Sequence, residues 1–292
     1  MRDPGSSSAA RAGAVAPGEL RALVEGALKE DLGSGDLTTR LTVPQGKQAR
    51  GAFINKQTLV VAGLPVAAEV FRVLEPSIGW EPLVEEGAEV GPDTRLAVAS
   101  GTAAVLLAGE RVALNFLQRL CGIATLTRRQ KTELAGLNVE LLDTRKTTPG
   151  LRAVEKYAVR VGGGRNHRLR LDDGILIKNN HLRLAGGIRP AVESARRQRP
   201  PGMLVEVEVS NVAELEEAIG AGADVALLDN MTPDEVRECV VRTARRLRLE
   251  VSGGISAANI RAYGETGVDY ISVGALTHSA PAADIHFLIE PL

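Results

Sequence analysis

The chain of 292 residues is poor in cysteine and has no long apolar run. Its two cysteines, Cys121 and Cys239, exclude a disulfide framework and a cysteine-based metal cluster, and we expect both to be buried thiols in apolar helices. No apolar run approaches the roughly 20 residues of a membrane-spanning helix, which argues against a membrane protein. Residues 1–18 lack the apolar segment of a secretory signal, so we expect a disordered tail and a cytoplasmic protein.

Aromatic residues are also few, at 3% of the chain, and the formal net charge is only -1. Nucleic-acid-binding chains usually combine a basic face with aromatic side chains, so this composition argues against nucleic acid as a partner. Lysine is rare as well, with seven residues in the chain and none after Lys178. The apolar content of 44% is enough for one barrel-sized domain and a smaller one.

One segment departs from this near-neutral background. Residues 143–181 hold nine Lys or Arg residues against four acidic ones. A solvated basic face is the simplest reading of such a segment. The glycine run at 162–164, and two lysines placed where apolar runs end, favour instead a pocket for a small polyanion.

The first third of the chain predicts a small α+β unit. Helices are expected over 19–30 and 65–75, and strand-like runs lie at 50–61, 78–84 and 94–100. Strands that are grouped in sequence, with helices on one side, are typical of an α+β architecture.

Strand and helix patterns alternate in the rest of the chain, after a helical stretch from 110 to 134. The strands are apolar on both faces, which indicates a parallel sheet or barrel. No GxGxxG or GxxxxGK[ST] motif occurs, so neither a dinucleotide fold nor a P-loop is supported. The expected strands are 139–143, 174–178, 203–209, 224–229, 249–253 and 269–274, with helices near 185–198, 211–221, 233–247 and 256–265.

Each expected strand ends in residues suited to chemistry or to phosphate contact. In a β/α barrel these ends meet at one mouth, where the active site lies. Six such ends in succession exceed what turns alone require. They are 143–146, 178–180, Glu208, 229–230, 252–254 and Gly274.

Arg145, His167, Arg168 and Lys178 would form one cationic side of this mouth. Arginine binds a carboxylate through two parallel hydrogen bonds and lysine acts as a point charge, so together they suit a small dianion. Taken singly, each is as readily explained by a surface ion pair or by a satisfied histidine.

Glu208 and Asp229, at the ends of neighbouring strands, would form the opposite side and suit Mg²⁺ carried in by a phosphorylated substrate. Structural salt bridges to nearby lysines are the alternative. Glu206 shares the face of Glu208, and alternation does not decide which of the two enters the site. The glycine-bearing strand ends at 252–256 and 272–278 would bind phosphate through backbone N–H groups.

One known family matches these residues. The chain resembles the quinolinate phosphoribosyltransferases, also called nicotinate-nucleotide pyrophosphorylases (carboxylating), from about residue 19 to its end. The most specific stretch is DTRKTTPGLRAVEKYAVRVGGGRNHR, at 143–168. Further matching stretches are 109–125, 172–181, 206–209, 227–230, 252–255 and 272–278.

The resemblance implies an α/β fold with two domains. An N-terminal α/β sandwich would span 19–112, completed by 279–292, and an open β/α barrel of six to seven strands would span 113–278. It implies a homodimer in which Arg111 is contributed across the interface. It also implies a reaction of de novo NAD biosynthesis, in which quinolinate and phosphoribosyl pyrophosphate give nicotinate mononucleotide, CO₂ and pyrophosphate.

The resemblance also implies roles for single residues. Lys146, Glu208 and Asp229 would be catalytic, the two acids acting with Mg²⁺ directly or through the substrate. Asn179 stands where many members have an acid. Quinolinate would be bound by Arg111, Thr144, Arg145, His167, Arg168 and Lys178. Phosphoribosyl pyrophosphate would be bound by Lys146, Glu208, Asp229, Ser252, Gly253, Gly254, Gly274 and His278.

Two other readings stay open. A nicotinate phosphoribosyltransferase, or another paralogue acting on a monocarboxylate, would need fewer cations than this mouth offers. A non-catalytic barrel that senses a phosphosugar would have no use for Lys146, Glu208 and Asp229, and all three are present.

Overall fold

The computed structural model describes residues 15–292, which form two compact units. Among the described helices, none is long and apolar enough to cross a membrane. The barrel unit holds residues 129–147 and 164–278, and the N-terminal unit holds the described residues up to 128 together with 148–163 and 279–292.

Two expectations concern how the chain is divided. The domain boundary expected between 112 and 113 stays a prediction. The disordered tail expected over 1–18 falls mainly on residues 1–14, which lie outside the described residues. Its last two residues are corrected by the structure, because helix α1 (Pro17–Leu32) already begins at Pro17. Proline is well suited to the first helical turn, where its missing N–H has no partner to lose.

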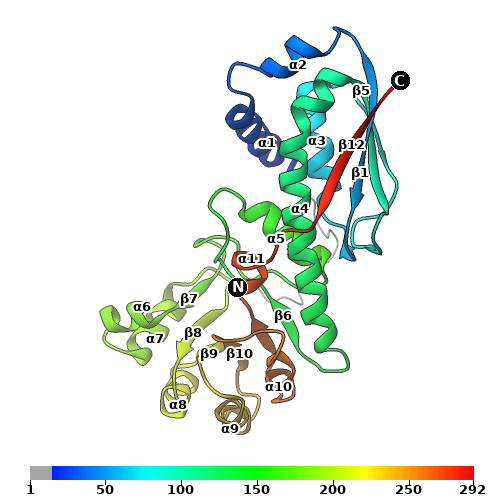
Figure 1. The fold of residues 1–292 in the computed structure, drawn as a ribbon. Coiled ribbons are helices and arrows are strands. Elements are labelled where there is room, and N and C mark those ends of the chain that lie inside the picture. Colours follow the sequence, from blue (N-terminus) through cyan, green and yellow to red (C-terminus); the bar gives the residue numbers. More distant parts are fainter. Residues whose placement is uncertain (1–14) are drawn as a thin grey trace. The chain divides into compact units, whose positions relative to one another are not determined.

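The N-terminal unit is built on an antiparallel sheet of four strands in the order β12-β1-β5-β3. The last strand of the chain pairs along β1, so both ends of the sequence contribute to one sheet (Figure 1). Phe53, Phe71 and Phe287 pack together over this sheet. The elements are α2 (Leu37–Thr42), β1 (Gln48–Asn55), α3 (Leu64–Leu74), β3 (Gly79–Pro82), β5 (Arg95–Thr102), α5 (Arg152–Val161) and β12 (Ile285–Pro291).

The strand expected over 50–61 is two strands, β1 and β2 (Leu59–Val60). Asn55 ends the first, because its side-chain amide donates to the carbonyls of Gln57 and Gly91, each at 2.7 Å. Strand β2 then pairs separately with β4 (Glu89–Val90). A buried asparagine thus supplies the hydrogen bonds of a turn that the apolar pattern had concealed.

The barrel unit confirms the α/β fold class. Its six strands are all parallel, in the order β6-β11-β10-β9-β8-β7. Helices α7, α8 and α9 lie outside the strands in Figure 1. The strands are β6 (Glu140–Leu142), β7 (Ile175–Ile177), β8 (Val205–Val209), β9 (Val225–Asp229), β10 (Arg248–Ser252) and β11 (Tyr270–Ser272). The helices are α6 (Asn179–Ala185), α7 (Ile188–Gln198), α8 (Val212–Ala221), α9 (Pro233–Thr243), α10 (Ile260–Gly264) and α11 (Ala275–His278).

The barrel is open, because β6 and β7 are the two edges of its sheet. Beyond β6 the chain adds one parallel bridge, from Leu142 to Arg165. This bridge fixes the start of the segment that carries His167 and Arg168. The backbone N–H of His167 donates to the buried carboxylate of Asp143 at 2.9 Å, which anchors the same segment to the end of β6.

Local sequence signals set the helix starts that follow the strand ends. Asn211 caps α8 by accepting from the backbone N–H of Glu214, and Thr232 with Glu235 forms a capping box at α9. Both starts lie directly after strands, so the polar strand ends are held in short, defined turns. Cys121 and Cys239 are buried free thiols, as expected.

Candidate active site

Four of the expected site residues lie at the carboxyl ends of three adjacent strands. Glu208 is the last residue but one of β8, Asp229 ends β9, and Ser252 ends β10 just before Gly253. Ser252 and Asp229 are direct neighbours across the β9–β10 pair. The barrel therefore brings these residues to one mouth, as the alternation of strands and helices along the chain had predicted.

Glu208 lies at the rim of this mouth and Glu206 lies one layer deeper. The Nζ of Lys178 is 3.7 Å from Glu208 Oε2, and the backbone N–H of Asn179 donates to Glu208 Oε1 at 3.4 Å. Glu206 is fully buried, and its Oε2 is 3.1 Å from Nε2 of His167. Both acids are buried, Glu206 at 0% exposure and Glu208 at 7%, so Glu208 is only slightly the more accessible of the two.

Lys146 is held against the loop that follows β11. Its backbone N–H donates to the Thr144 hydroxyl at 3.0 Å, and its carbonyl accepts from the Thr277 hydroxyl at 2.8 Å. A Cβ on Gly274 would lie 2.9 Å from Cδ of Lys146 and 3.2 Å from Nε2 of His278. Glycine at 274 thus leaves room for the lysine stem, and Lys146, Gly274 and His278 form one contact group.

The turn after β10 is possible only with glycine. Gly253 has φ +98°, and a Cβ there would lie 2.2 Å from Oδ1 of Asn230. Asn230 is itself left-handed, at φ 57°, and its side-chain amide donates to Oδ2 of Asp229 at 2.9 Å. Gly254, at φ +62°, has open space around it. This turn therefore presents backbone groups to the mouth beside the Asp229 carboxylate.

Two arginines form the cationic side. The pKa of Arg168 is lowered, first by burial and then by the charge of Arg145, so the two guanidinium groups lie close enough to repel each other. The Nε of Arg145 is buried and has no hydrogen-bond partner in the described part of the chain. Two like charges, one of which keeps an unsatisfied donor, form a site that an anion would stabilise.

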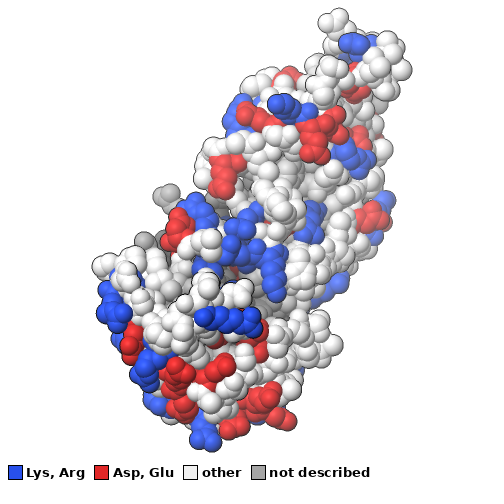
Figure 2. Space-filling model, turned by 90° about the vertical axis from the view of Figure 1, so that its left-hand side faces the viewer, with Lys and Arg blue, Asp and Glu red and all other residues white. Residues whose placement is uncertain are grey.

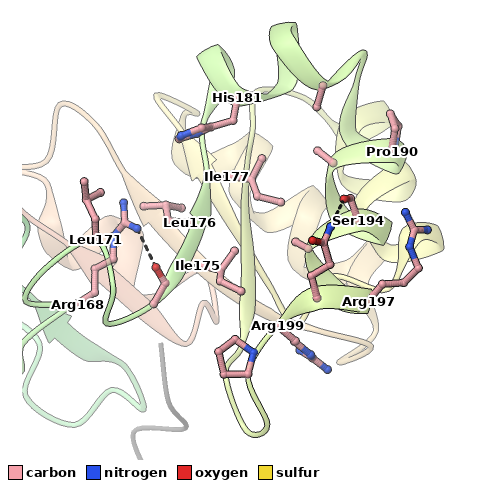
Figure 3. Close-up of a pocket in the computed structure, with 16 residues that line it drawn as sticks. Arg168, Leu171, Ile175, Leu176, Ile177, His181, Pro190, Ser194, Arg197 and Arg199 are labelled. Atoms are coloured by element: carbon pink, nitrogen blue, oxygen red, sulfur yellow. Dashed lines mark hydrogen bonds between the residues drawn. The ribbon is translucent and has the colours of Figure 1, made fainter.

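Arg168 also lines a groove of about 870 Å³ beside β7 and α7. Figure 3 shows its guanidinium at one end of the groove, hydrogen bonded to the carbonyl of Gly174 at 2.9 Å. Ile175 and Ile177 point into the groove from β7, and Arg197 lies at the far end. The arginine is therefore anchored by a backbone carbonyl while facing open space.

His167 has both ring nitrogens engaged within the protein. Its Nδ1 accepts the backbone N–H of Arg168 at 2.8 Å, and its Nε2 faces Glu206 and, at 3.5 Å, Oε2 of Glu250. A direct contact between His167 and substrate stays a prediction. In this structure the imidazole of His167 accepts a hydrogen bond from the backbone of the next residue, Arg168.

Burial raises the pKa of both buried acids. For Glu250 the charge of Glu206 is the next cause, and its pKa rises to about 8. For Glu206, Arg168 and Lys178 act in the opposite direction without cancelling the effect of burial.

Arg111 lies in the N-terminal unit, on α4 (Ala103–Glu133). It is exposed and forms no hydrogen bond or ion pair within the described residues. Its contribution to a site stays a prediction.

Comparison with known proteins decides the family. The quinolinate phosphoribosyl transferase N-terminal domain matches residues 36–121, and the C-terminal domain of the same family matches residues 123–288. The chain belongs to the quinolinate phosphoribosyltransferase family.

Relatives agree along nearly the whole chain. A probable nicotinate-nucleotide pyrophosphorylase [carboxylating] of Synechocystis sp. is 44% identical over 90% of both chains. The corresponding protein of Bacillus subtilis is 42% identical over 91% of this chain and 92% of its own. The solved nicotinate-nucleotide pyrophosphorylase of Francisella tularensis superposes with a TM-score of 0.91 at 37% identity, covering 97% of this chain and 100% of that one.

The fold alone does not separate this family from others. Human nicotinic acid phosphoribosyltransferase superposes with a TM-score of 0.62 at 12% identity, covering 93% of this chain and 73% of its own. The choice of acid must therefore come from the residues of the mouth.

In this member of the quinolinate phosphoribosyltransferase family, the structure shows contacts of two residues to which the sequence had assigned no individual role. Asn230 supports Asp229 and fills the space under Gly253, and Glu250 lies beside His167. A signal for each was present in the sequence. Asn230 directly follows an acid at a strand end, and Glu250 is a charged residue between the apolar Leu249 and Val251 of β10.

Proposed function

We propose that this protein transfers the phosphoribosyl group of phosphoribosyl pyrophosphate to quinolinate, with loss of CO₂, in de novo NAD biosynthesis. The observation that carries the proposal is the proximity of two arginines, Arg145 and Arg168, of which Arg145 keeps an unpartnered buried donor. A planar acid with two carboxylates would relieve their repulsion. Thr144 and Lys178 would complete its binding, with Arg111 as described below.

The transfer step needs a nucleophile, a leaving group and charge balance. The ring nitrogen of quinolinate attacks C1 of the ribose, and the bond from C1 to pyrophosphate breaks with its electron pair. Lys146 would neutralise the departing pyrophosphate, since the residue is exposed and Gly274 leaves room for its stem. Glu208 and Asp229 would face the positive charge that develops on the sugar. His278 would bind the pyrophosphate beside Lys146.

Decarboxylation follows from the first step. Once the ring nitrogen is quaternary, the bond from the adjacent carbon to its carboxylate breaks, and the electron pair stays on the ring carbon. That carbon then takes a proton from solvent, which gives nicotinate mononucleotide. No dedicated base is needed, and the protein contributes chiefly orientation.

Glu208 and Asp229 also suit Mg²⁺. They offer hard oxygen ligands at adjacent strand ends, next to the turn at 252–254 whose N–H groups would bind phosphate. When bound, the ion would supply positive charge to the pyrophosphate of the substrate.

We propose further that the protein acts as a cytoplasmic homodimer and that Arg111 reaches the site of the partner subunit. Its exposure and lack of partners support this. Arg111→Ala should be inactive, yet should recover part of its activity when mixed with Lys146→Ala, because hybrid dimers would contain one intact site. Absence of recovery, with subunit exchange shown by a tag, would contradict a shared site.

The decisive assay offers quinolinate or nicotinate with phosphoribosyl pyrophosphate and Mg²⁺, and measures CO₂ and mononucleotide. Mononucleotide from quinolinate with equimolar CO₂ supports the proposal. Product from nicotinate alone would favour the monocarboxylate reading, and binding of phosphoribosyl pyrophosphate without turnover would favour a sensor. Figure 2 shows basic and acidic side chains on one face, with a group of basic ones near its middle and acidic ones prominent towards the bottom of the view.

A further inference from the structure

A layer of buried titratable side chains lies directly beneath the mouth. Glu206 on β8 and Glu250 on β10 are buried, and both approach Nε2 of His167, at 3.1 and 3.5 Å. Oε1 of Glu206 and Oε2 of Glu250 have no hydrogen-bond partner among the described residues. Buried acids that are only partly satisfied are costly, so their retention calls for a role.

A metal ion is the first occupant to consider, because the three ligand atoms lie within 4.8 Å of one another. Two atoms bound to one tetrahedral zinc are about 3.3 Å apart, which is close to the separations from Nε2. The histidine tautomer contradicts this assignment. Since Nδ1 accepts the N–H of Arg168, the proton of a neutral ring must be on Nε2, which then has no lone pair for a metal.

The same tautomer explains the acids. An Nε2–H needs an acceptor, and at 3.1 Å Glu206 provides one, while Oε2 of Glu250 lies 3.5 Å from the same nitrogen without forming a hydrogen bond. The ring is then held from below by carboxylate oxygens, and its Nδ1 is presented to the backbone of Arg168. The guanidinium of the same residue, Arg168, donates a hydrogen bond to the carbonyl of Gly174.

We propose that Glu206 and Glu250 are positioning residues for the diacid-binding arginine: they fix the tautomer and orientation of His167, which in turn fixes Arg168. The inference rests on the proposed function, since it assumes that Arg168 binds a carboxylate of the substrate. Glu206 also acts on Arg168 through space, because its charge favours the protonated guanidinium. The acids thus serve the site without occupying it.

The kinetic test separates the two substrates. Glu206→Leu should raise the KM for quinolinate about tenfold or more and change that for phosphoribosyl pyrophosphate less than about twofold. Glu206→Gln keeps a carbonyl acceptor for Nε2–H and should recover most of the loss. Glu250→Gln tests the second acid in the same way. Glu140→Gln, a half-exposed acid at the start of β6, is the matched control and should change neither KM.

Equal effects of Glu206→Leu on both KM values, or no effect, would overturn the inference. Because Glu206→Leu could fail to fold, the ring of His167 is also read directly by ¹⁵N-edited NMR of the wild type, assigned with His167→Asn. An Nε2–H signal is expected, and an unprotonated Nε2 would overturn the inference. The inference would also be overturned if purified wild-type protein contained one metal ion per chain and the Glu250→Gln variant did not. Wild-type protein that does not consume quinolinate would instead refute the proposed function, and the NMR result would still stand.

Discussion

Each unit of this protein contains a completely buried glutamate, Glu155 in the N-terminal unit and Glu206 in the barrel unit. The two differ in how many hydrogen bonds their carboxylates accept. In the N-terminal unit Glu155 accepts hydrogen bonds from Arg119 at 2.9 Å and from the N–H and hydroxyl of Thr148. In the barrel unit Glu206 has a histidine on one oxygen and, within residues 15–292, no hydrogen-bond partner on the other. A buried acid whose oxygens both accept hydrogen bonds stabilises the fold as a cross-link between segments. A buried acid with one unpaired oxygen lowers stability, and we attribute its presence to function.

The comparison implies that polar groups of the barrel mouth serve activity more than stability. Lys146→Ala should therefore lower kcat about 10²- to 10³-fold, since it removes the cation that faces the leaving group, and should leave thermal unfolding nearly unchanged. Steady-state assays and calorimetry measure the two effects. Lys131→Ala, a lysine of the same unit that pairs with Glu140 at 4.0 Å, is the control and should retain activity.

Glu155 should show the reverse pattern. Glu155→Gln leaves Arg119 without its counter-charge and should lower the free energy of unfolding by about 2–4 kcal/mol. The KM for both substrates should change little at a temperature where the variant is folded. Urea unfolding measures the loss. The control is Glu193→Gln, which removes an exposed partner of Arg189 and should lower the free energy of unfolding by less than about 0.5 kcal/mol. Unchanged stability in Glu155→Gln would break the comparison.

Arg168 tests the binding side of the mouth. Arg168→Ala should reduce kcat/KM for quinolinate about 10²-fold, because one ionised carboxylate loses its partner. Affinity for phosphoribosyl pyrophosphate should persist. Arg170→Ala removes a neighbouring exposed arginine that pairs with Asp172, and should be close to wild type. Equal losses in the two variants would point to general electrostatics instead of a specific contact.

The smallest effect concerns pH. Because the pKa of Glu250 is raised from 4.5 to about 8, the folded protein keeps a proton that the unfolded chain has already lost in this range. The free energy of unfolding contributed by this group is therefore greatest below about pH 4.5 and falls as the pH rises towards about 8. Glu250→Gln removes the titration, so its stability should fall less over this interval, by roughly 1–3 kcal/mol. Parallel curves of melting temperature against pH would contradict the assignment.

The parallel strands and the polar residues at their ends could be predicted because their signals are local. Strand-length apolar runs, capping residues such as Asn211 and Thr232, and polar strand ends each appear within a few residues of sequence. The roles of single residues came from resemblance to a family. The depth of Glu206 could not be predicted, because alternation assigns a face of a strand and not a distance from the mouth.

The sequence by itself determined the α/β class, the parallel strands and the residues available at their ends, since side-chain period and turn chemistry are properties of short segments. Only the tertiary structure decided that His167 turns its ring to two buried acids and its Nδ1 to Arg168. It likewise grouped residues 148–163 with the N-terminal unit. These features depend on contacts between segments far apart in the chain, whose distances and hydrogen-bond partners exist only once the strands are paired.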